Sequence, residues 1–295
     1  MPTDHWTSLT HPNLDPAAAT SDKPAMSLLW KLALAALSVY ALVGLAAYLG
    51  QRRLMYFPDR ARTMPVQAGL VGVEERVLKT PDGARVVAWY GKARPGQPTL
   101  LYFHGNAGSL VNRAPRVERF MAQGWGVYMM TYRGYGGSTG SPTETANVAD
   151  ARLAYGALVL EGVEPASIIL YGESLGSGIA VRLATERPVG GVVLDAPYTS
   201  IVDVAAQAYP FLPVRALIVD RYETTKYIAQ VRAPILILHG ERDMVIPVAM
   251  GREVFRLANE PKRLVTFANG GHSDLYVDGN GALEAMRDWM HSLKR

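Results

Sequence analysis

The stretch LYGESLGSGIAV, residues 170–181, places two serines, a glutamate and three glycines between two apolar arms. The arm before it is typical of a β-strand, and the arm from Leu175 onward is typical of a helix. Gly172, Ser174 and Gly176 therefore form a G-x-S-x-G pattern at a strand-to-helix corner. Such a corner strains the serine backbone and leaves no room for side chains two places away. Ser174 is a candidate nucleophile, and the alternative is an ordinary helix cap; Ser177 lacks the flanking glycines.

Outward from this corner, short β-type runs alternate with amphipathic helix-length segments over residues 66–295. The predicted strands are Glu74–Leu78, Arg85–Tyr90, Thr99–Phe103, Gly126–Thr131, Ser167–Tyr171, Gly191–Leu194, Ile235–Leu238 and Leu264–Phe267. The predicted helices are Val111–Gln123, Thr145–Glu161, Leu175–Arg187, Val248–Asn259 and Ala282–Lys294. Several strands are continuously apolar, which predicts an eight-stranded, mostly parallel α/β sheet covered by helices on both faces. Residues 198–230 interrupt the alternation and are predicted to form a small cap.

A serine hydroxyl needs a base to become a nucleophile, and histidine is the usual one. His272 lies in a Gly-rich loop after the last predicted strand, where its ring can reach the edge of the sheet. We therefore predict His272 as the base. The other histidines are expected in the N-terminal tail (His5, His11), in supporting loops after strands (His104, His239) and in the last helix (His291).

The carboxylate that orients the base is expected between the serine and the histidine in the chain. Asp243 follows the buried strand Ile235–Leu238 and is the predicted acid. Asp195, which follows the preceding strand, is the alternative. Asp274 is too close to His272 in sequence to be preferred.

Backbone amides must stabilise the negative charge that develops during acyl transfer. One donor is expected from Leu175, directly after the candidate nucleophile. The other is expected from Asn106, in the Gly-rich loop that follows Thr99–Phe103. The candidate site thus comprises Ser174, Asp243 and His272, with Asn106 and Leu175 as an oxyanion hole.

Residues 28–49 are apolar except for Lys31, and a helix of that length rises about 33 Å, enough to span a membrane. We predict an uncleaved anchor after a disordered tail at residues 1–25; a signal peptide is the alternative. Four arginines follow the span within residues 52–62, whereas Lys23 alone precedes it. The positive-inside rule therefore predicts a cytoplasmic catalytic domain, and a translation start at Met26 would make the opposite face plausible.

The composition excludes several classes of function. The chain has 295 residues, a formal net charge of +4 and no cysteine. Thiolate catalysis and cysteine-ligated zinc are excluded, and the scattered basic residues do not indicate nucleic-acid binding. The predicted chemistry requires no metal and no organic cofactor.

The segments GESLG, HGNAG, HGERD and GGH occur in an order that resembles the α/β-hydrolase superfamily, over roughly residues 70–292. YFHGNAGS and TYRGYGGSTGSPTE further resemble small membrane-anchored serine hydrolases related to animal protein depalmitoylases. In this chain Thr131 stands where many such proteins have an acidic residue. The resemblance implies that Arg133 and Tyr135 support the mouth of the site.

These observations predict a serine hydrolase that cleaves small acyl esters or thioesters through a Ser-His-Asp triad. A serine peptidase acting on short peptides uses the same chemistry and is the first alternative. The second is a non-catalytic, membrane-tethered binding module that has kept the fold.

Overall fold

The computed structural model describes residues 23–277 and 281–293, so the predicted tail at residues 1–22 lies outside the described residues. Two compact units divide the chain between Ala46 and Ala47, inside helix α1 (Lys23–Met55). Helix α1 begins five residues before the predicted span, with Pro24 in its first turn, where proline is well tolerated. The predicted tail, residues 1–25, therefore overlaps the first three residues of α1.

The first unit contributes most of α1. The segment Ser27–Met55 is long and apolar enough to cross a membrane. Its position near the N-terminus fits a membrane anchor and equally a signal sequence.

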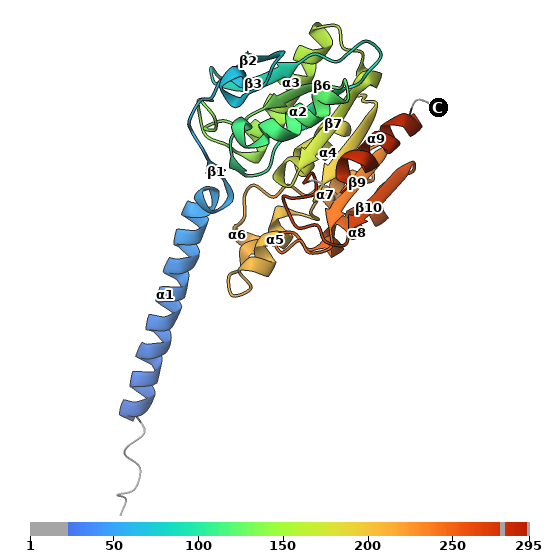
Figure 1. The fold of residues 1–295 in the computed structure, drawn as a ribbon. Helices are drawn as coiled ribbons and strands as arrows, with labels where there is room; N and C mark the ends of the chain where they lie inside the picture. The colour runs from blue at the N-terminus through green and yellow to red at the C-terminus, as the bar shows by residue number, and fades with distance from the viewer. Residues whose placement is uncertain (1–22, 278–280, 294–295) are drawn as a thin grey trace, which may run out of the picture. The chain divides into compact units, whose positions relative to one another are not determined.

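The second unit contains a sheet of eight strands in the order β10-β9-β8-β7-β4-β6-β3-β2 (Figure 1). The strands are β2 (Val73–Lys79), β3 (Arg85–Gly91), β4 (Thr99–Phe103), β6 (Gly126–Met130), β7 (Ile168–Glu173), β8 (Gly191–Asp195), β9 (Ile235–Gly240) and β10 (Lys262–Phe267). Strand β3 pairs antiparallel with both β2 and β6, and the remaining pairs are parallel. The prediction of an eight-stranded, mostly parallel sheet is confirmed.

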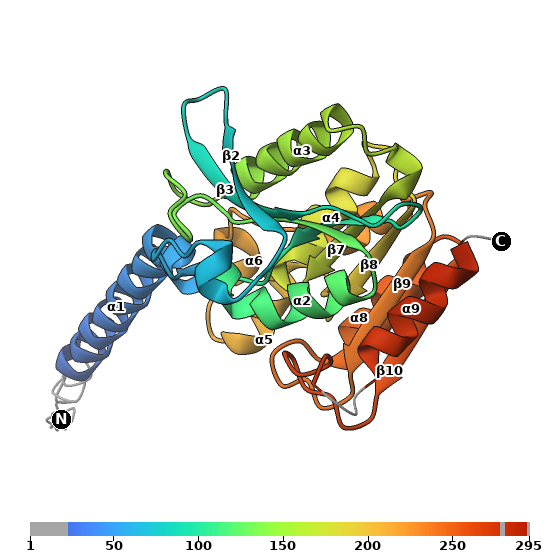
Figure 2. The ribbon, with the colours of Figure 1, turned by 45° about the horizontal axis from the view of Figure 1, so that its top comes forward.

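Helices cover both faces of this sheet (Figure 2). They are α2 (Ala114–Ala122), α3 (Glu144–Leu160), α4 (Leu175–Ala184), α8 (Val248–Leu257) and α9 (Ala282–Leu293). Side chains of α3, α4 and α8 share one hydrophobic cluster with Leu101 and Phe103, whereas α2 and α9 share the other with Leu100 and Tyr102. Because successive side chains of a strand point to opposite faces, both faces of β4 are buried, as its continuous apolar sequence requires.

Two predicted helices differ from the observed ones by three residues at one end, and the bounds of the others differ by one or two residues. The segment predicted as Val111–Gln123 splits into a 3₁₀ turn, Leu110–Arg113, and α2, because Pro115 favours a new helix start. Helix α4 ends at Ala184, three residues early, since the approach to Pro188 disfavours helical backbone. Lys294, the predicted end of the last helix, lies outside the described residues.

Between β8 and β9 the chain forms three short helices, α5 (Ile201–Ala208), α6 (Val214–Leu217) and α7 (Thr224–Ile228). They fall within residues 198–230, and we call α5 and α6 the cap. Ser200 begins α5 by accepting a hydrogen bond from the Asp203 amide at 3.0 Å.

Short elements complete the fold. A parallel pair of two-residue strands, β1 (Phe57–Pro58) and β5 (Ala107–Gly108), joins the chain after α1 to the loop that follows β4. Two further 3₁₀ turns are Pro65–Ala68 and Pro165–Ser167.

Candidate active site

The corner after β7 has the strained backbone that the sequence predicts. Ser174 has φ 50° and ψ −116°, which places a non-glycine residue in the left-handed half of φ space. A Cβ on Gly176 would lie 2.0 Å from the Phe103 carbonyl oxygen, and one on Gly172 would lie 2.6 Å from the Gly176 carbonyl oxygen. Both glycines are therefore required for β7, α4 and β4 to pack closely around the serine.

The structure brings together the three side chains that we call the candidate triad: Ser174, Asp243 and His272. His272 Nε2 lies 3.0 Å from Ser174 Oγ, and His272 Nδ1 lies 2.7 Å from Asp243 Oδ2. Because a carboxylate only accepts, Nδ1 carries the proton and Nε2 is free to accept the serine proton. The three residues follow β7, β9 and β10, so they meet at the carboxyl ends of parallel strands.

Asp243 is a buried carboxylate that remains ionised. Its Oδ1 accepts hydrogen bonds from the Val245 and Ile246 amides, both at 2.8 Å. Burial alone would raise its pKa, but hydrogen bonding to His239 and His272 outweighs burial and holds the pKa well below the ordinary value. Asp243 can therefore fix the orientation and the tautomer of His272.

The alternative acid, Asp195, has hydrogen-bond partners other than His272 and acts on it only through its charge. Its Oδ2 instead accepts from the Tyr171 hydroxyl at 2.6 Å and from Arg116 Nη1 at 3.2 Å. Burial raises the pKa of Asp195, against the opposing charge of Arg116. The geometry thus favours Asp243 as the partner of the base.

None of the other histidines in the described residues is hydrogen-bonded to Ser174. His104 is fully buried, its Nδ1 lies 2.6 Å from the Gly105 carbonyl oxygen, and burial lowers its pKa to about 3. His239, near the end of β9, lies beside the candidate acid: its Nε2 is 2.9 Å from the Ile246 carbonyl oxygen and 3.5 Å from Asp243 Oδ2. His291 is part of α9, while His5 and His11 fall outside the described residues.

The loop after β4 runs beside the candidate nucleophile. A Cβ on Gly105 would lie 3.6 Å from Ser174 Cβ. The loop is held by the Tyr132 hydroxyl, which donates to the His104 carbonyl at 2.5 Å, and by the Tyr135 hydroxyl, which donates to the Asn106 carbonyl at 2.7 Å. Within the described chain, the amides of Asn106 and Leu175 donate no hydrogen bond, so both remain available to an oxyanion.

Arg133 and Tyr135 lie in one loop but contact different parts of the domain. Tyr135 contacts the Asn106 loop, as expected for support of the site. Arg133 instead pairs with Asp150 at 2.8 Å and with Asp82, away from the candidate triad. The hydroxyl of Thr131 donates to the Val87 carbonyl at 3.1 Å and ties the start of this loop to β3.

Sequence reasoning missed the role of Glu173, which it treated as a variable position between Gly172 and Ser174. Glu173 forms ion pairs with Arg113 at 2.9 Å and with Arg116 at 3.1 Å, and the Tyr102 hydroxyl donates to it at 2.5 Å. Burial alone would raise its pKa, but the two arginines outweigh burial and hold the pKa well below its usual range. The available signal was the pair Arg113 and Arg116, three residues apart within the segment predicted as the helix Val111–Gln123.

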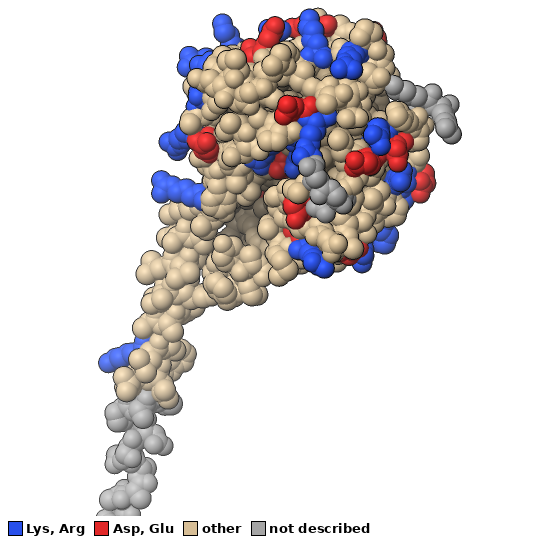
Figure 3. Space-filling model, viewed as in Figure 1, with Lys and Arg blue, Asp and Glu red and all other residues tan. Residues whose placement is uncertain are grey.

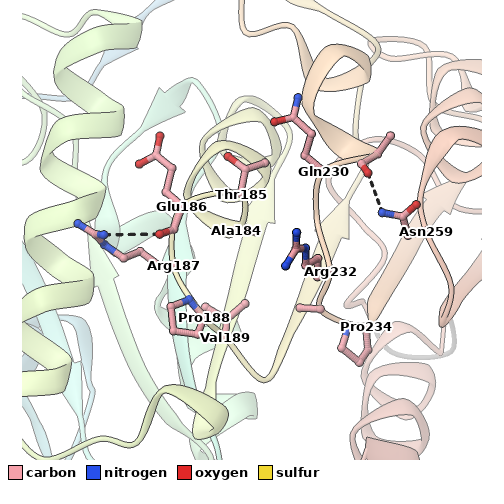
Figure 4. A pocket seen from close by; sticks show the side chains of 12 residues that line it. Ala184, Thr185, Glu186, Arg187, Pro188, Val189, Gln230, Arg232, Pro234 and Asn259 are labelled. Atoms are coloured by element: carbon pink, nitrogen blue, oxygen red, sulfur yellow. Dashed lines mark hydrogen bonds between the residues drawn. The ribbon is translucent and has the colours of Figure 1, made fainter.

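Two cavities lie at opposite ends of the parallel strands. The larger, about 910 Å³, opens at the amino ends of β8 and β9, beside Val189 and Pro234, and no triad member lines it (Figure 4). A smaller cleft of about 340 Å³ is lined by Gly108 and by Glu173 and Ser273, the sequence neighbours of Ser174 and His272. The larger cavity therefore lies on the wrong edge of the sheet for this chemistry.

The described residues contain no cluster of three or more His, Asp or Glu side chains suited to a metal ion.

On the face of the domain seen in Figure 3, basic and acidic side chains are interspersed.

Comparisons with known proteins agree with this architecture. The family model described as serine aminopeptidase, S33, matches residues 95–224. An uncharacterized protein of Mycobacterium tuberculosis is 38% identical over 266 residues, covering 86% of this chain and 95% of that protein. The α/β hydrolase domain-containing protein WAV2 of Arabidopsis thaliana is 29% identical, covering 78% of this chain and 83% of that protein.

Among solved structures, the Pyrococcus furiosus esterase PF2001 superposes with a TM-score of 0.63 at 17% identity, covering 81% of this chain and 98% of that one. This likeness concerns the fold. Taken with the sequence relatives, it shows that the chain belongs to the α/β-hydrolase superfamily.

Proposed function

We propose that this protein is a serine hydrolase that cleaves carboxylic ester or thioester bonds through an acyl-enzyme on Ser174. The observation that carries the proposal is the line of hydrogen bonds from Ser174 Oγ to His272, 3.0 Å, and from His272 to Asp243, 2.7 Å. Such a line is the arrangement that lets an imidazole deprotonate an alcohol at neutral pH.

In the first half-reaction Ser174 Oγ attacks the acyl carbon while His272 Nε2 takes the hydroxyl proton. The amides of Asn106 and Leu175 stabilise the oxyanion, with the N-terminus of α4 behind them. The tetrahedral intermediate collapses, and His272 gives its proton to the departing alcohol or thiol.

In the second half-reaction a water molecule takes the place of the leaving group. His272 removes a proton from the water, whose oxygen attacks the acyl-enzyme carbonyl. Collapse releases the carboxylic acid, and His272 returns the proton to Ser174 Oγ. The net reaction converts ester and water into acid and alcohol, or thioester and water into acid and thiol.

We further propose that α1 anchors the protein as a single membrane span, with the catalytic domain on the cytoplasmic side. The support is the apolar segment Ser27–Met55 and the excess of arginines that follows it. The opposite face is the alternative.

Peptide hydrolysis is the competing activity, because the matching family model is described as a serine aminopeptidase. The test is to compare p-nitrophenyl acetate and butyrate with amino-acid and dipeptide p-nitroanilides, using Ser174→Ala protein as the background. We expect ester turnover well above that background and no anilide turnover. Efficient anilide turnover with inert esters would contradict the proposal.

A further inference from the structure

A groove of about 360 Å³ lies beside the candidate oxyanion loop, on the cap side of the domain. Its walls come from two parts of the chain that are far apart in sequence: the C-terminal end of α1, including Leu54, and the cap, including Val204 and Ala208. The side chains lining it are mainly apolar, and none is charged. A groove of this kind binds hydrocarbon better than polar ligands.

Asn106 lies where the groove meets the candidate site. It lines the groove, and its backbone amide is one of the two proposed oxyanion donors. Its side-chain amide donates to the Met55 carbonyl at 2.8 Å, and its own carbonyl accepts from the Phe57 amide at 3.0 Å. A substrate whose carbonyl oxygen reaches the Asn106 amide therefore has this groove available for its acyl chain.

The wall contributed by α1 is fixed to the cap by polar contacts. Gln51 donates to the Leu217 carbonyl at 3.1 Å and accepts from the Val219 amide at 2.8 Å. Arg52 pairs with buried Asp220 at 3.0 Å. These contacts make the end of α1 a constant part of the groove.

Exposed apolar side chains gather around the same region. Phe57, Tyr209 and Phe211 are 52%, 41% and 65% exposed, and the charged residues Arg215 and Asp203 of α6 and α5 pair with each other at 2.9 Å without lining the groove. Gln51 lies two residues after the predicted span 28–49, about 3 Å along the helix. The part of α1 that lines the groove therefore follows the predicted span directly in the chain.

We propose that this groove is the acyl-chain site, and that the substrate is an ester or thioester of a medium-length or longer acyl group taken from the membrane surface. The inference rests on the proposed hydrolase function and adds the substrate class. A methylene occupies about the volume of a water molecule, ~30 Å³, so the groove accommodates roughly ten carbons.

The test is a series of p-nitrophenyl esters from acetate to dodecanoate, presented below their aggregation concentrations to the full chain in detergent. We expect kcat/KM to rise by about fourfold for each added methylene until the groove is full. A flat or falling profile, with acetate hydrolysed well, would overturn the acyl site and leave the hydrolase function intact. Failure to hydrolyse any ester would instead contradict the function itself.

Matched variants test the position of the site. Ala208→Trp fills the groove from α5, and we expect at least a tenfold loss of kcat/KM on the decanoate with little change on the acetate. Gln207→Trp, at the neighbouring exposed position that does not line the groove, is the control and should change neither. Equal effects of the two tryptophans, or equal effects on both esters, would contradict the assignment.

Leu54→Ser tests the wall formed by α1 without adding bulk. We expect a severalfold loss of kcat/KM on the decanoate and none on the acetate, and an unchanged decanoate rate would remove α1 from the site.

Two further substrates distinguish the source of the acyl chain: phosphatidylcholine vesicles and an S-acylated cysteine peptide. Turnover of either supports the proposal and identifies the source, whereas turnover of neither would overturn a membrane-derived substrate.

Discussion

Replacing Ser174 with alanine is expected to lower kcat for ester hydrolysis by about 10⁶-fold, to the level left by binding and the oxyanion amides alone. The loss is large because, in the proposed mechanism, the hydroxyl 3.0 Å from His272 is the atom that forms the acyl-enzyme. The measurement is steady-state turnover of a p-nitrophenyl ester by purified protein, with thermal unfolding as the check on folding.

Ser177→Ala is the matched control for that variant. The Ser177 hydroxyl lies one helical turn away and donates to the Ser174 carbonyl at 2.7 Å, so it faces the backbone of the corner. We expect activity within a fewfold of the unaltered protein. Near-normal activity of Ser174→Ala, or equal losses in both variants, would remove Ser174 from the mechanism.

Replacing Asp243 with asparagine is expected to lower kcat by about 10⁴-fold. The new amide can donate to His272 Nδ1, which moves the imidazole proton to Nε2 and leaves no base facing Ser174. The comparison variant is Asp195→Asn, which changes the acid whose hydrogen bonds go to partners other than His272. A larger loss in Asp195→Asn than in Asp243→Asn, with both proteins folded, would reverse the assignment of the acid.

The pH profile gives a second readout for the same residue. Burial alone would lower the pKa of His272, but the hydrogen bond and charge of Asp243 outweigh burial and raise it above the ordinary value of 6.5. Because only the neutral imidazole accepts a proton, kcat/KM should fall as the pH drops through that raised pKa. In Asp243→Asn the acid limb should move to lower pH. An unmoved limb would show that Asp243 does not set the charge of His272.

The sheet could be predicted because its strands carry strong local signals. Thr99–Phe103 and Ile235–Leu238 are continuously apolar, which identifies strands buried on both faces, and the glycines of the corner identify the turn after β7. The family model, the sequence relatives and the solved structures confirm the resemblance to the α/β-hydrolase superfamily. The relation to depalmitoylases and the catalytic roles of the site residues stay predictions.

Contacts between residues that are far apart in the chain could not be predicted from the local sequence pattern. The pairing of Phe57–Pro58 with Ala107–Gly108 involves two residues on each side, too few for any periodicity. The ion pairs of Glu173 depend on side chains that only the folded sheet brings beside Ser174. The apolar groove likewise exists only because the end of α1 meets the cap, and neither segment alone indicates a cavity.

The most direct test of the central claim is labelling of the folded, full-length protein with a fluorophosphonate probe, followed by mass spectrometry of the digested protein. The account predicts one probe adduct per chain on Ser174, lost in Ser174→Ala and strongly slowed in Asp243→Asn. A folded protein that stays unlabelled, or that carries the adduct on another residue, would contradict an activated nucleophile at the end of β7.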